Sequence, residues 1–297
     1  MNTLTSLSLG GVRLRLLGTP IGGVLVAIGY AWGMGTPVPP ILAALLLVGV
    51  ALMALGESVL NDANDYISGV DQHESLRPGH LVAAGHRPHV LKVAAAMFLI
   101  LGTTTLVLAL LLGGRSEFVP FVPITALLAW MYTSGAKPYG HRGLGEVGIF
   151  MAYGLGACLG PMIVLRVPIQ PTAMILVVGV GSFAVSTMVA QNQRDMVTDS
   201  AVGKQTISSI AGSRVTSRIL IGATALGSGS LVVSVLLSRG LWHSVMLLVL
   251  MSLLLLTARG AWSRPGSADW KRITNALYRL TPIVLAATSL LLALSQR

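Results

Sequence analysis

Long apolar segments recur along the whole chain, each close to the roughly 20 residues that an α-helix needs to cross a lipid bilayer. We expect nine spanning helices, near residues 18–36, 40–60, 89–113, 117–134, 146–165, 171–191, 216–237, 241–258 and 277–295. Helices are expected because backbone polar groups in lipid must be satisfied internally, and membrane strands would alternate over about ten residues. Only 10% of the 297 residues are charged, against roughly a quarter in a soluble domain. The sequence therefore predicts an all-α integral membrane protein, with a single transmembrane domain over residues 1–297.

Basic residues are distributed unevenly between the two ends of these helices. Sixteen of the twenty Lys and Arg lie at the N-terminus or around the connections after the second, fourth, sixth and eighth helices. The other side has four: Arg115, Arg166, Arg239 and Arg297. Since positive loops stay in the cytoplasm, we expect a multi-pass plasma-membrane protein with a cytoplasmic N-terminus and an external C-terminus. This topology, together with anionic lipid headgroups, explains the net charge of +10, and nucleic-acid binding is not expected because there is no compact basic domain.

The acidic residues gather on the side expected to be cytoplasmic. Nine of the ten lie there, and five of these fall in two short segments, Asn61 to Asp71 and Gln191 to Asp199. Asn61 and Asp65 are four residues apart, as are Asp195 and Asp199, so on a helix each pair projects from one face. Helix capping would explain scattered acids, but two matched clusters at the ends of apolar spans favour a functional site that holds a cation.

The chemistry of these two segments indicates a hard metal ion. Carboxylates with Asn side chains suit Mg²⁺, which keeps several waters and completes its shell with substrate phosphates. Arg77, Arg194 and Lys204 supply cations beside the acids that suit diphosphate oxygens. The arrangement predicts a phosphorylated substrate.

A weak internal echo links the two acidic segments. Each leads into a loop that closes with a similar tetrapeptide, Ala84-Gly85-His86-Arg87 in one and Ala211-Gly212-Ser213-Arg214 in the other. We therefore expect two pseudo-repeated four-helix halves, approximately 1–140 and 141–260, followed by a ninth helix at about 277–295, with the site at their interface.

At these residues the chain resembles the UbiA superfamily of membrane prenyltransferases. The signatures of that superfamily are an Asn-Asp-x-x-Asp-type motif after helix two and an Asp-x-x-x-Asp motif after helix six, and the chain has both, at Asn61 to Asp71 and Asp195 to Asp199. The resemblance extends over nearly the whole chain. Nine helices with the active side facing the cytoplasm are also the plan of the superfamily.

Further motifs resemble the branch that prenylates 1,4-dihydroxy-2-naphthoate in menaquinone synthesis. The second motif fits that branch at Asn192, Arg194, Asp195, Asp199, Gly203, Lys204 and Thr206. The loop after helix four has the similar segment Gly143-Leu144-Gly145-Glu146. The chain departs from the branch before helix one, where Arg13-Leu14-Arg15-Leu16 replaces an Arg-Pro pair, so the acceptor stays open.

The resemblance implies transfer of a prenyl chain from a prenyl diphosphate to an aromatic acceptor, with Mg²⁺ as cofactor. Two Mg²⁺ ions are expected, held by Asp62, Asp65 and Asp71 on one side and by Asp195 and Asp199 on the other, with the diphosphate between them. Substrate binding is expected of Asn61, Arg77, Arg142, Asn192, Arg194 and Lys204. Catalytic roles are expected of Asp65, Asp195, Lys137, Tyr132 and Tyr139, the two tyrosines by steadying an allylic cation with their ring faces.

Three alternatives remain at this stage. The enzyme could prenylate another aromatic acceptor in specialised metabolism, or it could cyclise a prenyl diphosphate without an acceptor. An ion-coupled transporter would also place acids in membrane helices, but its acids would be expected near the midplane of the bilayer. The acids here gather at one face beside cations, which favours an enzyme acting on an amphipathic diphosphate.

Overall fold

The computed structural model describes residues 14–69, 81–82, 85–263 and 269–294. These residues are almost entirely helical, and the part of the chain described contains no strand beyond one isolated bridge between Arg142 and Gln205. The helices are α1 (Gly18–Gly33), α2 (Pro40–Ile67), α3 (Pro88–Leu112), α4 (Phe121–Thr133), α5 (Gly145–Phe150), α6 (Gly160–Val164), α7 (Pro171–Arg194), α8 (Met196–Ala201), α9 (Ile207–Arg239), α10 (Leu241–Ser263) and α11 (Trp270–Ala293). The protein is an all-α integral membrane protein, as the sequence predicts.

Six helical segments are long and apolar enough to cross a membrane: α2, α3, α5 to α6, α7, α9 and α11. The expected spans near the other three positions are helical too. However, α1 has 16 residues and α4 has 13, fewer than the roughly 20 that a full span needs, so nine spans remain a prediction.

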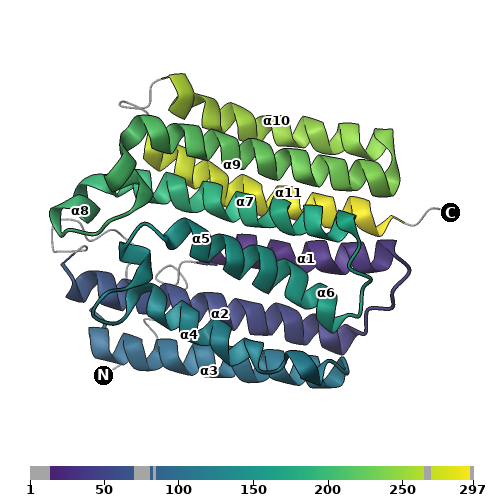
Figure 1. Ribbon diagram of the computed structural model, residues 1–297, viewed down its shortest axis with the longest axis horizontal. Coiled ribbons are helices and arrows are strands. Elements are labelled where there is room, and N and C mark those ends of the chain that lie inside the picture. The colour runs from purple at the N-terminus through teal and green to yellow at the C-terminus, as the bar shows by residue number, and fades with distance from the viewer. Residues whose placement is uncertain (1–13, 70–80, 83–84, 264–268, 295–297) are drawn as a thin grey trace.

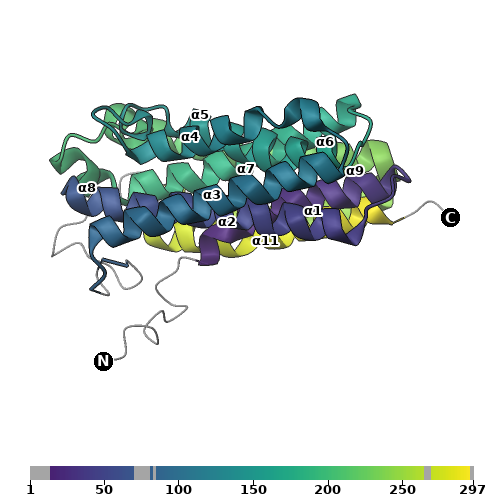
Figure 2. The same cartoon turned by 90° about the horizontal axis from the view of Figure 1, so that it is seen from below.

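The long helices lie side by side with their axes along one direction, as two perpendicular views show (Figures 1 and 2). The closest helix pairs are α2 with α3, α7 with α9, and α1 with α11. Helix α7 is the most enclosed of the candidate spans. In its most apolar 18-residue stretch 78% of the residues are buried, compared with 28–44% in the other spans. The short α8 and the loops around it lie at one end of the bundle (Figures 1 and 2).

Several helix boundaries differ from those expected from hydropathy, for local reasons. Helix α2 continues to Ile67, because the acidic segment after its apolar part is itself helical. Helix α9 begins at Ile207, where Thr206 and Ser209 form a capping box, and Gly212 then interrupts it with φ of 75°. Helix α11 begins at Trp270, capped by the Asp269 side chain, which accepts a hydrogen bond from the Arg272 backbone N–H.

The segment 145–164 is a single span built from three pieces. Residues Met151–Leu159, here called η4, form a π-helix that joins α5 to α6. Its wider turns contain Gly154 and Gly156, which add little side-chain bulk, and Gly160 begins α6 directly after it. Such π-helical turns occur often at functional sites.

Arginines cap the helix ends on the side opposite α8. Arg166 donates from Nε to the carbonyl of Gly113 at 2.8 Å, and Arg115 donates from Nε to the carbonyl of Ile163 at 3.2 Å. Arg239 donates from Nε to the carbonyl of Leu292 at 3.0 Å. Each guanidinium thus satisfies a carbonyl at the C-terminal end of α3, α6 or α11, where the helix dipole favours a cation.

Candidate active site

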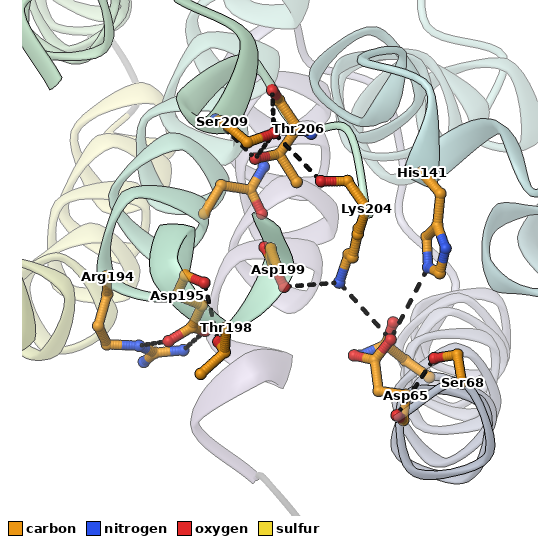
Figure 3. A network of polar contacts seen from close by, with 12 residues as sticks. Asp65, Ser68, His141, Arg194, Asp195, Thr198, Asp199, Lys204, Thr206 and Ser209 are labelled. Atoms are coloured by element: carbon orange, nitrogen blue, oxygen red, sulfur yellow. Dashed lines mark hydrogen bonds and ion pairs between the residues drawn. The ribbon is translucent and has the colours of Figure 1, made fainter. Parts of the chain in front are cut away.

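The two acidic segments meet at the α8 end of the bundle. Asp65 in the last turns of α2 and Asp199 in α8 are both buried, with 6% and 1% of their surface exposed. The Lys204 ammonium lies between them, with Nζ 3.5 Å from Oδ1 of Asp65 and 3.4 Å from Oδ1 of Asp199 (Figure 3). Carboxylates separated by 134 residues in the chain therefore lie beside one cation.

The turn after α8 fixes the position of Lys204. Gly203 adopts φ of 74°, a left-handed conformation that glycine accepts without strain. The Lys204 N–H then donates to the Asp199 carbonyl at 2.9 Å, and the Ser209 hydroxyl donates to the Lys204 carbonyl at 3.1 Å. The backbone of Lys204 is therefore held directly beside the acid that its side chain contacts.

Burial and charge shift the protonation of this pair. Burial raises the pKa of the Asp199 carboxyl to about 6, although the Lys204 ammonium acts in the opposite direction. For Lys204, burial is the largest effect and lowers the pKa, but the charges of Asp65 and Asp199 outweigh it, so the pKa lies above its ordinary value. At neutral pH the Lys204 ammonium is therefore charged and the Asp199 carboxyl is largely ionised.

The loop after α4 brings His141 to the same place. Its Nε2 lies 3.8 Å from Oδ1 of Asp65 (Figure 3). Burial, and then the Lys204 charge, lower the pKa of His141 to about 4, so the imidazole is neutral at pH 7. Two backbone hydrogen bonds hold the loop: Gly143 N–H donates to the Gln205 carbonyl at 2.7 Å, and Gln205 N–H donates to the His141 carbonyl at 3.2 Å. Sequence reasoning missed His141, because nothing in the sequence pattern indicates that this loop pairs with the one after α8.

The remaining acids of the motifs have partners of their own. Asp195 accepts two hydrogen bonds from the Arg194 guanidinium, at 2.8 and 2.6 Å, and this pair lies apart from the contacts between Lys204 and the other two acids (Figure 3). The Asn61 amide donates to Oδ2 of Asp65 at 2.9 Å. Asp62 is buried and accepts a hydrogen bond from the Leu81 backbone N–H. Arg194 and Asn61 thus bond to motif carboxylates, and the substrate binding expected of them stays a prediction.

Asn64, within the first motif, ties α2 to the loop after α4. Its side-chain amide donates to the hydroxyls of Thr133 at 3.1 Å and Ser134 at 2.8 Å. This cross-link holds the start of the loop that carries Tyr139 and His141. Sequence reasoning gave Asn64 no role, although it stands inside the motif.

Tyr132 and Tyr139 form an aromatic pair beside the acids. Their ring centroids are 5.4 Å apart and the planes are inclined by 69°. A Cβ at Gly140 would lie 2.7 Å from the Tyr132 ring, and one at Gly148 would lie 2.7 Å from the Tyr139 ring, so both glycines are needed for this packing. Burial, and then the charge of Glu57, raise the pKa of Tyr139 to about 12, so its phenol stays protonated.

A second polar contact joins α5 to α7 near this pair. The Asn192 amide donates to Oε1 of the buried Glu146 at 2.9 Å. Asn192 is therefore held by the glutamate of the Gly-Leu-Gly-Glu segment, and the two motifs that resemble the naphthoate branch are in direct contact.

Some expected site residues are not part of this cluster. Lys137 and Arg142 are exposed in the loop after α4, and within the described residues neither forms an ion pair with a motif acid. Asp71 and Arg77 lie outside the described residues. Over the described part of the chain, no group of three or more His, Cys, Asp or Glu is arranged to hold a metal ion by itself.

The membrane bundle and the paired acidic motifs define a class of protein. The pattern of the UbiA prenyltransferase family matches residues 23–281, most of the chain, so the chain belongs to this family and is a membrane prenyltransferase. The ion-coupled transporter considered from the sequence is thereby set aside.

Two similar proteins from Mycobacterium share one name. The chain is 33% identical over 242 residues to the 1,4-dihydroxy-2-naphthoate octaprenyltransferase of Mycobacterium leprae, covering 80% of this chain and 79% of that protein. It is also 33% identical over 220 residues to the enzyme of the same name from Mycobacterium tuberculosis, covering 73% of each.

Solved structures share the fold. A UbiA homologue from Aeropyrum pernix matches 93% of this chain and 97% of its own with a TM-score of 0.69 and 14% identity. A UbiA homologue from Archaeoglobus fulgidus, solved with DMAPP and Mg²⁺, matches 95% of this chain and 99% of its own with a TM-score of 0.62 and 14% identity.

Proposed function

We propose that this enzyme uses Mg²⁺ to transfer a prenyl chain from a prenyl diphosphate to 1,4-dihydroxy-2-naphthoate. The observation that carries the proposal is the convergence of Asp65 and Asp199 on a single cation at the end of a membrane bundle. The names of the Mycobacterium relatives support the naphthoate acceptor. The Archaeoglobus structures with DMAPP or GPP and Mg²⁺ support the donor and the metal.

The residues present fit a hard divalent ion. Two buried carboxylates already approach one positive charge within 3.5 Å, and oxygen ligands of this kind suit Mg²⁺. Asp65 and Asp199 would hold it, with Asp62, Asp71 and Asp195 as further carboxylates of the two motifs. When bound, Mg²⁺ supplies Lewis-acid stabilisation of the charge that builds on the departing diphosphate oxygen.

The side chains of the chain itself then bind and orient the diphosphate. Lys204 and His141 lie on loops that are hydrogen-bonded to each other, so the backbone that carries them is held in place before substrate arrives. Lys137 and Arg142, which are exposed in the loop after α4, are the cations that we assign to the outer part of the headgroup, and we expect Arg77 to bind the diphosphate as well. Arg194 holds the Asp195 carboxylate in a bidentate pair and so sets its orientation.

Reaction requires that the allylic carbon be kept from water. Breaking its bond to the diphosphate oxygen leaves an allylic cation, which the apolar helices of the bundle exclude from solvent. The rings of Tyr132 and Tyr139 present electron-rich faces that stabilise a cation. The ring carbon of the acceptor that carries the carboxylate then forms the new carbon–carbon bond, and loss of carbon dioxide from that carbon restores the aromatic ring.

We also propose that the site faces the cytoplasm, with the N-terminus inside and the C-terminus outside, and that residues 1–140 and 141–260 act as two halves of one domain. The distribution of sixteen against four basic residues supports this orientation. The contacts of Lys204 with motif acids from both α2 and α8 support a site shared by the two halves.

Product analysis tests the function directly. Membranes containing the enzyme are incubated with Mg²⁺, 1,4-dihydroxy-2-naphthoate and prenyl diphosphates of several lengths, and the products are identified by mass. A prenylated naphthalene that has lost its carboxylate is expected, and it should be missing for Asp199→Asn and without the acceptor. Consumption of the diphosphate without acceptor, giving a cyclic product, would contradict the proposal, as would a prenylated product that forms only with another aromatic acceptor.

A further inference from the structure

The same carboxylate oxygens that suit a metal ion are in contact with Lys204. Its Nζ lies 3.5 Å from Oδ1 of Asp65 and 3.4 Å from Oδ1 of Asp199, and the latter atom is buried without a hydrogen bond among the described residues. Two buried carboxylates that face each other need a compensating cation, since like charges at short range destabilise a poorly solvated site. The ammonium supplies that charge from within the chain.

The Lys204 side chain can leave this position without any change in the backbone. Its N–H and carbonyl are fixed by Asp199 and Ser209, and the next residue, Gln205, is held by two hydrogen bonds to the loop after α4. The side chain itself is a flexible four-carbon stem that ends in a compact charge. A fixed backbone with a movable ammonium allows the charge to swing between the acids and a neighbouring anion.

We propose that Lys204 is an exchangeable counter-ion that competes with the divalent metal for the Asp65 and Asp199 carboxylates. A divalent ion and an ammonium on the same oxygen atoms repel each other, so one must leave when the other binds. The released ammonium then pairs with the diphosphate that accompanies the metal. Before the metal binds, Lys204 thus compensates the charge of the two buried carboxylates. When the metal binds, the released ammonium couples metal binding to binding of the diphosphate headgroup.

This inference rests on the proposed metal site, and metal binding measured without substrate tests it separately from activity. The full-length protein in detergent is stripped of metal, and Mn²⁺ binding is followed by electron paramagnetic resonance of the free ion. We expect Lys204→Met to bind Mn²⁺ about tenfold more tightly than the wild type, equivalent to about 1.4 kcal/mol. We expect Lys204→Arg, which keeps a cation, to stay near the wild type. Lys271→Met, which removes an exposed lysine at the start of α11, is the matched control and should leave Mn²⁺ affinity unchanged.

Binding of inorganic pyrophosphate tests whether the released ammonium pairs with a diphosphate. With Mn²⁺ present at saturation, Lys204→Met should bind pyrophosphate at least about tenfold more weakly than the wild type, because the released ammonium is missing. Equal or weaker Mn²⁺ binding by Lys204→Met, while the wild type binds the ion and Asp199→Asn does not, would overturn the exchange and leave the metal site standing. If the wild type and Asp199→Asn bound Mn²⁺ alike, the proposed metal site itself would fail.

A measurement on the wild type alone covers the case in which Lys204→Met does not fold. Lysine side chains are reductively methylated with and without Mg²⁺, and the modified peptides are quantified by mass. Exchange predicts that Mg²⁺ raises the methylation rate of Lys204 several-fold while that of Lys271 is unchanged. A rate at Lys204 that is unchanged or lowered by Mg²⁺ would overturn the proposal.

Discussion

Replacing Asp199 by Asn tests the proposed metal site with almost no change in the size and shape of the side chain. The substitution removes one negative charge and keeps a neutral oxygen of similar position. At the observed 3.4 Å between Oδ1 and the Lys204 ammonium, the attraction between unit charges is about 5 kcal/mol at an effective dielectric constant of 20. Part of this is offset by the cost of burying the carboxylate, which also disappears in the variant.

The net effect on catalysis should resemble the loss of one charged stabilising group. We expect kcat/KM for the prenyl diphosphate to fall by about 10²–10³, or about 2.7–4 kcal/mol, at fixed Mg²⁺. The fold should persist, since Lys204 keeps its contact with Asp65. The assay is initial-rate product formation by purified protein in detergent, with Asp269→Asn as control because Asp269 caps α11 and contacts no motif acid among the described residues. If Asp199→Asn kept more than a third of wild-type kcat/KM, the assignment of Asp199 to the metal site would be wrong.

Further measurements address the scaffold, the aromatic pair and the acids. Asn64→Ala loses two side-chain hydrogen bonds and should lower the free energy of unfolding by about 1–3 kcal/mol, measured by denaturant titration in micelles; an unchanged midpoint would contradict this. Gly140→Ala should reduce kcat by up to about a hundredfold with little change in metal affinity, because the Tyr132 ring must move away from the new methyl group; wild-type kcat would show that the ring position is unimportant. The Mg²⁺ concentration for half-maximal rate should rise as the pH falls below about 6, because a proton competes with the metal for Asp199; equal values at pH 5.5 and 7.5 would count against it. Removing divalent ions with a chelator should abolish turnover, and added Mg²⁺ should restore it; activity that persists in the chelator would exclude the metal.

Much of the bundle follows from local sequence signals. Apolar runs of the length of a span identify helices such as α3 and α7, because in lipid only helices and closed barrels satisfy the backbone. The helix boundaries were harder to predict, because mean hydropathy does not identify helical turns made of polar residues. Helix α9 therefore begins nine residues before the expected 216, at the Thr206 cap, and α2 continues through its acidic motif.

The candidate site was predictable in composition but not in its contacts. The four-residue spacing of the acids indicated a shared face within each motif, and each motif was expected to hold a metal ion. The contact of both Asp65 and Asp199 with the Lys204 ammonium was not predicted. Which atoms meet depends on tertiary contacts between loops, and these leave no periodic trace in the sequence. The hydrogen bonds that join Gln205 to the loop after α4 are of this kind, and they bring His141 to Asp65. The outward position of Lys137 could not be predicted either, because a lysine near an acidic motif is equally compatible with a solvated loop.

The arginine caps at the far end of the bundle give the molecule an electrical polarity. Arg115, Arg166 and Arg239 contribute three positive charges at this end. The carboxylate of Glu117, 3.2 Å from Arg115, and the negative ends of the three capped helices partly neutralise them. At roughly half a charge for each of these three helix ends, the dipoles offset about half of the three arginine charges, and Glu117 offsets one more. These arginines therefore attract an anionic diphosphate less than their number suggests, whereas the described loops and helix ends on the α8 side carry most of the excess positive charge. Long-range steering would guide the headgroup to that one end and leave the prenyl tail to follow within the bilayer.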